Sequence, residues 1–341
     1  MTPGPGHAAA KHRENAMPTR LARRSALAAP ALLLGRPAGA QGGWPGKPVT
    51  LIVPWAPGGS NDVVARLLAP QLEARFGQAF IIENRPGGGG SVGMGLVARA
   101  RPDGLTLLVS SASNHVFHPL IAKDLGYDVR GALEGIAMLV DVPNVLAATK
   151  ALGIRTVPEL IARVKSDTHG MSFGSSGVGS SNHLAGELFR LRTGLDLTHV
   201  PYRGGGQAIT DLVAGTVPIV FLNLPTVVGP ADSGQVTLLA VCTDRRVGSR
   251  PDIPTMQEGG VPDYAVRSWT GLFAPRGTSR PMIETLALAL REILAMPAIQ
   301  ARLTDMASEP IWMDPAETDR FVAAEYERWA PVIRGANVRL E

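Results

Sequence analysis

The chain has 341 residues, with 33 Lys and Arg against 29 Asp and Glu, and 45% of its residues are hydrophobic, so it is long enough for one large or two medium domains with a packed core. Only 18% of the residues are charged, which excludes a highly charged disordered polymer. The formal net charge of +4 would favour nucleic-acid binding only if the basic residues gathered on the folded part of the chain.

The positive charge lies instead at the start of the chain. Residues 1–40 contain six basic residues and one acidic residue, so the rest of the chain is close to neutral and no nucleic-acid partner is expected. An Arg-bearing stretch ends at Arg23 and Arg24, an apolar run extends from Ala26 to Leu34, and a small-residue cleavage site follows at 38–40. This order predicts an export signal peptide, Tat-like or Sec, and a mature protein that is periplasmic and soluble. A basic tail that stays on the protein is the alternative.

The rest of the chain alternates short apolar runs with helical patterns. In chain order the predicted elements are strand 49–54, helix 61–76, strand 80–83, helix 91–100, strand 106–110, helix 157–166, strand 171–174, helix 182–193, strand 197–201, helix 206–214, strands 217–221 and 236–241, and helices 281–296, 297–308 and 315–335. Strands separated by helices of this length predict parallel pairing in an α/β sheet.

Three loops rich in Gly and Ser each precede a predicted helix. They cover residues 56–62, 173–183 and 202–206. At the start of a helix, free backbone N–H groups and the positive end of the helix dipole favour an anion. In any single loop, Gly and Ser can equally be turn and capping residues. Three such loops at strand ends in one α/β chain predict a shared ligand crevice.

The enzyme motifs in the sequence are incomplete. Gly88–Gly93 matches a dinucleotide-binding fingerprint, but no acidic residue follows the next strand. Gly174–Ser181 has the glycine spacing of a phosphate-binding loop, but Ser180 stands where the phosphates need Lys. The His residues have no Cys or carboxylate cluster at metal spacing. We therefore predict no catalytic residue, cofactor or metal, with a hydrolase or transferase that uses Asp62 and His183 as the rival interpretation.

Several short motifs occur along the chain in an order typical of one known family. They are PxxPGGxxDxxAR at residues 54–66, ENRPG at 83–87, PDG at 102–104, GxGSxxHL at 177–184, HVPYRG at 199–204 and NLP at 223–225. Together they resemble the substrate-binding proteins of tripartite tricarboxylate transporters, the Bug or TctC family. The resemblance covers residues 44–341.

The resemblance implies a two-lobed α/β fold of the type II periplasmic binding protein kind, with a ligand cleft between the lobes. Lobe 1 would comprise residues 44–143 plus 268–341, and lobe 2 residues 144–267. The protein would be a monomeric, non-enzymatic solute-binding protein that captures a small carboxylate and delivers it to the large and small subunits of a membrane permease. A periplasmic sensor that partners a sensor kinase is the alternative.

The resemblance also implies a set of ligand-binding residues. Carried over by position, they are Pro57, Gly58, Gly59, Ser60, Asp62, Ser111, Ser175, Ser176, Gly179, Ser180, Ser181, His183, Tyr202, Arg203, Gly204 and Asn223. Four positions depart from the family pattern, namely Leu105, Pro218, Leu222 and Asn61. Leu222 stands where relatives often carry Asp, which disfavours a ligand with an ammonium group. Asn61 replaces a small or hydroxyl residue and is expected to reshape the first loop.

Overall fold

The computed structural model describes residues 44–123 and 125–339. The predicted export signal at residues 1–40 lies outside the described residues. Within the described part of the chain, no helix combines the length and the apolar character needed to cross a membrane.

Ten strands pair in the order β2-β1-β3-β9-β4-β7-β5-β6, with β10 and β8 also pairing with β4. The strands are β1 (Val49–Val53), β2 (Phe80–Asn84), β3 (Thr106–Ser111), β4 (Leu133–Thr149), β5 (Met171–Ser175), β6 (Leu197–Pro201), β7 (Ile219–Asn223), β8 (Val236–Val241), β9 (Arg267–Pro275) and β10 (Glu309–Met313). The predicted parallel pairing is found for β1 with β2 and β3, and for β5 with β6 and β7. The two longest strands, β4 and β9, were not predicted from the sequence. They pair with each other in antiparallel orientation.

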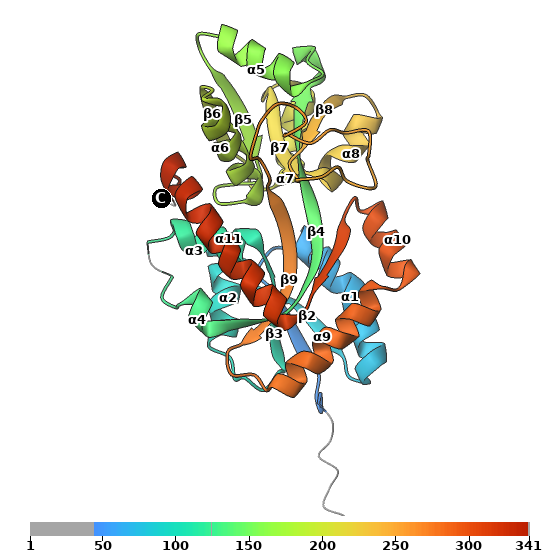
Figure 1. Cartoon of the computed structure of the whole chain (residues 1–341). Helices are drawn as coiled ribbons and strands as arrows, with labels where there is room; N and C mark the ends of the chain where they lie inside the picture. Colours follow the sequence, from blue (N-terminus) through green and yellow to red (C-terminus); the bar gives the residue numbers. More distant parts are fainter. Residues whose placement is uncertain (1–43, 124, 340–341) are drawn as a thin grey trace, which may run out of the picture. The chain divides into compact units, whose positions relative to one another are not determined.

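Strand β4 belongs to two sections of sheet (Figure 1). Its residues 133–143 pair with β9, and β10 pairs along the same stretch. From Asn144 onward its partners are β7 and β8. We call the part with β1, β2, β3, β9 and β10 the first sheet section, and the part with β5 to β8 the second sheet section. The partners of β4 therefore change between Pro143 and Asn144.

The helices lie close to their predicted bounds. They are α1 (Ser60–Phe76), α2 (Ser91–Ala98), α3 (His118–Ile121), α4 (Val129–Ala132), α5 (Val157–Ser166), α6 (Ser181–Thr193), α7 (Gly205–Ala214), α8 (Leu224–Asp232), α9 (Arg280–Leu294), α10 (Pro297–Asp305) and α11 (Pro315–Ala336). The predicted helix 297–308 ends early at Asp305, because Ala307 adopts a left-handed φ of 46° and the chain then enters β10. Helices α3, α4 and α8 were not predicted.

Apolar side chains fill both faces of the sheet sections. In β1, Leu51 packs into the core shared with α1 and α9, whereas Ile52 packs on the opposite side. This alternation is the period of two expected for a strand that is covered on both faces. Helices α7 and α8 cover the remaining face of the second section.

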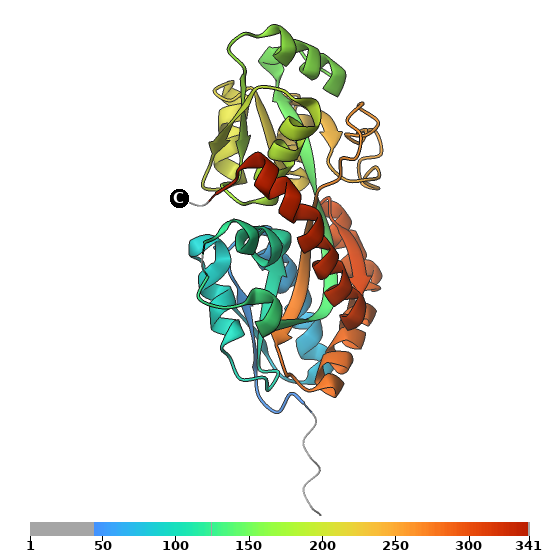
Figure 2. The ribbon, with the colours of Figure 1, turned by 60° about the vertical axis from the view of Figure 1, so that its left-hand side comes forward.

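Helix α11 contacts elements of both sections (Figure 2). Near its start, the hydroxyl of Thr318 accepts a hydrogen bond from the backbone N–H of Met138 in β4. At its end, the guanidinium of Arg190 in α6 donates to the carbonyl of Ala336. The helix therefore extends from the first sheet section to a helix of the second.

Candidate functional site

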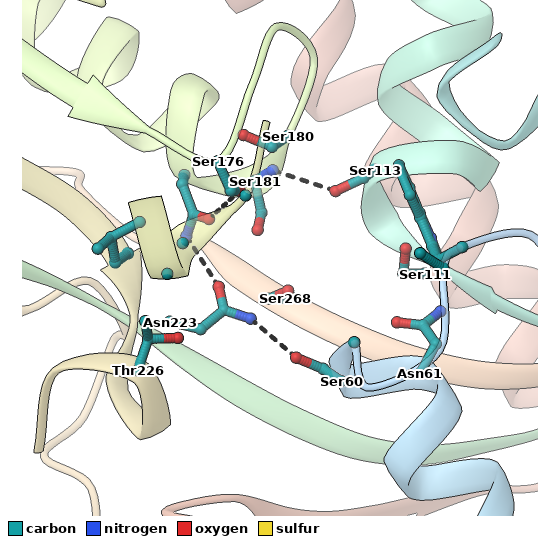
Figure 3. A pocket seen from close by; sticks show the side chains of 18 of the residues that line it. Ser60, Asn61, Ser111, Ser113, Ser176, Ser180, Ser181, Asn223, Thr226 and Ser268 are labelled. Carbon is teal, nitrogen blue, oxygen red and sulfur yellow. Dashed lines mark hydrogen bonds between the residues drawn. The ribbon is translucent and has the colours of Figure 1, made fainter. Parts of the chain in front are cut away.

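A pocket of about 390 Å³ opens where strands of both sections end (Figure 3). Small and hydroxyl side chains dominate its walls. The lining residues are Trp55, Ala56, Pro57, Gly58, Gly59, Ser60, Asn61, Ser111, Ser113, Ser176, Ser180, Ser181, Asn182, Arg203, Gly204, Gly205, Gly206, Leu222, Asn223, Thr226 and Ser268. All three Gly- and Ser-rich loops singled out in the sequence contribute to this one pocket, together with residues of β3, β7, α8 and β9.

Four helices begin at the wall of the pocket. The N-cap residues of α1, α6, α7 and α8 are Gly59, Ser180, Gly204 and Asn223, and each of them lines the pocket. Only Ser180 caps its own helix, by accepting a hydrogen bond from the backbone N–H of His183 at 3.1 Å. The first N–H groups of a helix lack partners within the helix, and the helix dipole adds partial positive charge there. The pocket therefore combines four positive helix ends.

The side chains that line the pocket include no carboxylate. Arg203 is the charged residue among them, and in the described part of the chain its guanidinium makes no hydrogen bond or ion pair. Backbone dipoles and one unpaired cation with no opposing acid make the pocket attractive to anions. A ligand ammonium group would find no carboxylate partner on these walls.

Two hydrogen bonds cross the pocket between the sheet sections (Figure 3). The backbone N–H of Ser181 donates to the hydroxyl of Ser113 at 3.1 Å, and the amide of Asn223 donates to the hydroxyl of Ser60 at 3.4 Å. Asn182 donates in turn to the side-chain oxygen of Asn223 at 2.8 Å. These contacts connect α1 and the turn after β3 with the starts of α6 and α8.

Two stacked histidines support the second Gly/Ser loop from behind. The imidazoles of His183 and His199 stack with centroids 3.8 Å apart. His183 Nδ1 accepts a hydrogen bond from the backbone N–H of Gly179 at 3.2 Å, and His199 Nε2 lies 2.7 Å from Ser175 Oγ. Burial lowers the pKa of His199 to about 3. His199 is therefore neutral, and its Nε2 can accept a hydrogen bond from the Ser175 hydroxyl.

Asp62 supports the first loop in a similar way. Its carboxylate accepts hydrogen bonds from the backbone N–H of Gly58 and from Arg66 Nε, both at 2.9 Å, and from Asn84 Nδ2 at 3.0 Å. Burial alone would raise the pKa of Asp62, but these hydrogen bonds outweigh burial and lower the pKa below its usual value. The carboxylate thus stays ionised and fixes the turn before α1.

Comparison with known proteins agrees with this architecture. The family model described as tripartite tricarboxylate transporter family receptor, TctC, matches residues 64–338. The chain belongs to this family. It is 36% identical to Protein BugT of Bordetella pertussis over 299 residues. The aligned part covers 87% of this chain and 92% of BugT.

Solved structures of relatives superpose over most of the chain. The structure titled Rpa4515 from R. palustris with adipate has a TM-score of 0.80 at 34% identity and covers 87% of this chain and 99% of that one. The periplasmic binding protein BugD has a TM-score of 0.76 at 32% identity, and the match covers 87% of this chain and 100% of BugD. MatC from Rhodopseudomonas palustris with bound malate has a TM-score of 0.75 at 32% identity, and the match covers 85% of this chain and 100% of MatC. The predicted family and the predicted two-lobed α/β periplasmic binding protein fold are both confirmed.

Most of the predicted ligand-binding residues of this receptor line the pocket. The exceptions are Asp62, Ser175, Gly179, His183 and Tyr202, which do not reach its wall. They support the loops instead, and the hydroxyl of Tyr202 donates to Asp211 at 2.9 Å. Whether the lining residues contact a ligand remains a prediction.

Some lining residues could not be found from the loop pattern. Ser113, Thr226 and Ser268 are single hydroxyl residues in segments without a Gly-rich signature. Ser268 reaches the pocket because β9 runs antiparallel to β4 through the middle of the sheet, and the sequence analysis did not include that pair of strands. Trp55 lies between the predicted strand 49–54 and the first Gly- and Ser-rich loop, and this position in the sequence could have indicated that it lines the pocket.

Proposed function

We propose that this receptor captures a small carboxylate anion in the pocket and delivers it to the large and small subunits of a membrane permease. The observation that carries the proposal is the convergence of four helix N-termini on a pocket with no acidic lining residue. The relatives solved with adipate and with malate support a carboxylate. We further propose that the mature receptor acts in the periplasm after its signal is cleaved.

The chemistry of the pocket suits capture followed by release. Backbone amides and hydroxyls hold a carboxylate through several moderate hydrogen bonds, and they remain neutral when the ligand leaves. A fully buried Lys or Arg would instead be left as an unpaired charge in the empty pocket, which is strongly unfavourable. The cation in this site, Arg203, is exposed and can stay hydrated when the pocket is empty.

We propose that residues 44–143 plus 268–341 form one lobe and residues 144–267 the other. The change in the partners of β4 after Pro143 supports this division, as does the start of β9 at Arg267. Ligand capture would then close the lobes by a hinge motion about these two strands.

The rival enzymatic interpretation requires Asp62 and His183 to act on a bound substrate. Neither side chain lines the pocket, and both are engaged in hydrogen bonds to the loops that they support. A general base must come within hydrogen-bond reach of the proton that it removes. Their positions therefore support a binding protein rather than a hydrolase or transferase.

The proposal is tested by calorimetry of the mature protein with malate, adipate, citrate, aspartate and benzoate. We expect saturable binding of at least one plain carboxylate and none of aspartate, whose ammonium group finds no acid. Adipamide, the neutral diamide of adipate, is the matched control and should not bind. Failure of every carboxylate to bind, or conversion of a bound one followed by NMR, would overturn the proposal.

A further inference from the structure

Asn61 is an unusual residue of the pocket wall. It is the second residue of α1, 7% of its surface is exposed, and its Nδ2 has no hydrogen-bond partner among the residues that the structure describes. Other buried donors without partners exist in the described chain, such as the amides of Asn114 and Asn144, but they do not line the pocket. Figure 3 shows the Asn61 amide at the pocket wall between Ser60 and Ser111.

Asn182, on the opposite wall, shows what a satisfied amide looks like in this pocket. It is 3% exposed, and its Nδ2 donates to Asn223 at 2.8 Å and to Asn144 at 3.3 Å. Its Oδ1 accepts a hydrogen bond from the Ser176 hydroxyl. A buried donor without a partner is unfavourable and is rare in folded proteins. Asn61 therefore lacks what its counterpart has, and because it lines the pocket, a group bound there can supply the missing partner.

The surroundings of Asn61 favour an anionic oxygen as that partner. Asn61 lies at the positive end of α1, and no carboxylate lines the pocket. The neighbouring Asp62 does not line the pocket, and its carboxylate already accepts hydrogen bonds from the Gly58 N–H and from Arg66. Within the described chain no hydrogen bond fixes the Asn61 amide, so rotation about χ2 can bring Nδ2 toward a ligand without breaking one.

We propose that Asn61 is a specificity-determining residue whose Nδ2 donates a hydrogen bond to a carboxylate oxygen of the ligand at the start of α1. The inference rests on the proposed function and assigns one carboxylate of the ligand to this wall. An amide at this position reaches further into the pocket than a small or hydroxyl side chain would.

The first test uses the protein without ligand. Because Asn61 donates to no protein atom, Asn61→Ala should leave the thermal midpoint of the unliganded protein unchanged or raise it. The matched control Asn182→Ala removes an amide of similar burial that has three partners, and it should lower the midpoint clearly. A midpoint for Asn61→Ala that falls as far as that of Asn182→Ala would mean that the amide is structural, and the proposal would be overturned even if no ligand were known.

The second test measures binding of malate and adipate by calorimetry. Loss of one charge-assisted hydrogen bond should weaken the binding of Asn61→Ala by about tenfold or more. Asn61→Asp, which places a carboxylate beside the anion, should bind neither probe measurably. Gln71→Glu adds the same charge to α1 away from the pocket, and it should bind like the wild type. If the wild type binds a probe and both Asn61 variants bind it equally well, the assignment of Asn61 is wrong while the proposed function stands. If the wild type binds neither, the proposed function and this assignment fail together for these probes.

Discussion

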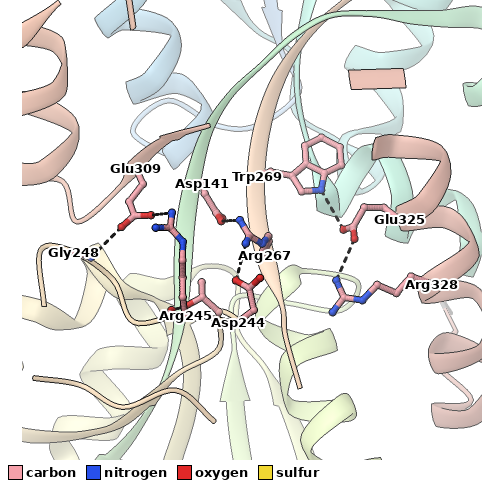
Figure 4. A network of polar contacts seen from close by, with 10 residues as sticks. Asp141, Asp244, Arg245, Gly248, Arg267, Trp269, Glu309, Glu325 and Arg328 are labelled. Atoms are coloured by element: carbon pink, nitrogen blue, oxygen red, sulfur yellow. Dashed lines mark hydrogen bonds and ion pairs between the residues drawn. The ribbon is translucent and has the colours of Figure 1, made fainter. Parts of the chain in front are cut away.

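Replacing Asp141 by Asn should stabilise the protein at neutral pH. Asp141 lies on β4 with 3% of its surface exposed, and its Oδ2 is 3.0 Å from Arg267 Nη1 (Figure 4). Its Oδ1 has no hydrogen-bond partner in residues 44–123 and 125–339. Burial raises the pKa of Asp141 from 3.8 to about 6, although Arg267 opposes this, and the acidic groups of Glu309 and Asp244 add to the increase.

The size of the effect follows from this difference in pKa. A shift of about two units corresponds to about 3 kcal/mol, since each unit is worth about 1.4 kcal/mol. Between about pH 4 and pH 6 the folded state binds the proton that the unfolded state has lost. The stability contributed by neutral Asp141 is therefore fully present below pH 4 and is lost as the pH rises through 6. Asn has the same shape and is neutral at every pH, so it removes this loss.

Urea unfolding followed by circular dichroism at pH 4.5 and pH 7.5 measures the effect. We expect Asp141→Asn to raise the free energy of unfolding by about 1–3 kcal/mol at pH 7.5 and to change it little at pH 4.5. Arg267 keeps Asp244 as a partner at 2.6 Å, so the variant leaves no isolated buried cation.

The matched control is Asp244→Asn, which neutralises the half-exposed partner of the same arginine. It should retain most of the wild-type pH dependence, slightly reduced because Asp244 contributes to the raised pKa of Asp141. If Asp141→Asn is less stable than the wild type at pH 7.5, the ion pair with Arg267 outweighs the burial of the carboxylate, and the reasoning is refuted.

Three further substitutions test the loops and the core. Asp62→Asn should destabilise the protein by about 1 kcal/mol at pH 7. Because folding lowers the pKa of this carboxyl, the difference in stability from the wild type should vanish as the pH falls below 3.8. A difference in urea unfolding that does not change with pH would contradict this. Gly186→Ala places a Cβ 2.0 Å from the ring of Phe173 and should lower stability by about 1–3 kcal/mol, so an unchanged urea midpoint would count against the packing described for α6. Arg203→Gln should weaken malate binding several-fold and flatten its salt dependence in calorimetry at low and high NaCl; an equal salt slope would mean that this cation does not act on the ligand.

Much of the fold could be predicted because most elements show a clear period. Helix α5 and strands β6 and β8 match their predicted bounds, since capping residues and turns flank them. Strand β4 could not be predicted because nearly all of its residues are buried, which leaves no polar alternation. Its sequence also contains Pro143, and proline usually argues against a central strand. Helix α8 was hidden by Pro225 and Pro230, which lie at its start and in its interior.

The site could be predicted wherever the chemistry follows the local sequence. Gly- and Ser-rich turns before helices indicate anion-binding amides, and those loops do line the pocket. The sequence could not separate lining residues from supporting ones, because His183 and Ser180 belong to the same motif although only Ser180 reaches the wall. It also could not place Ser268, which arrives on a strand whose pairing is set by residues far away in the chain.

The four helix N-termini at the pocket have a consequence for how such receptors diverge. Every residue except proline carries a main-chain N–H, so drift in the surrounding side chains leaves most of the N–H groups at these helix ends in place as long as the turns keep their shape. Selection can then alter ligand preference through a few wall positions, such as Asn61, Leu222 and Thr226, without rebuilding the part that recognises charge. Under the proposed function, the cargo of this receptor could therefore change through such wall positions while the helix ends that attract an anion stay in place.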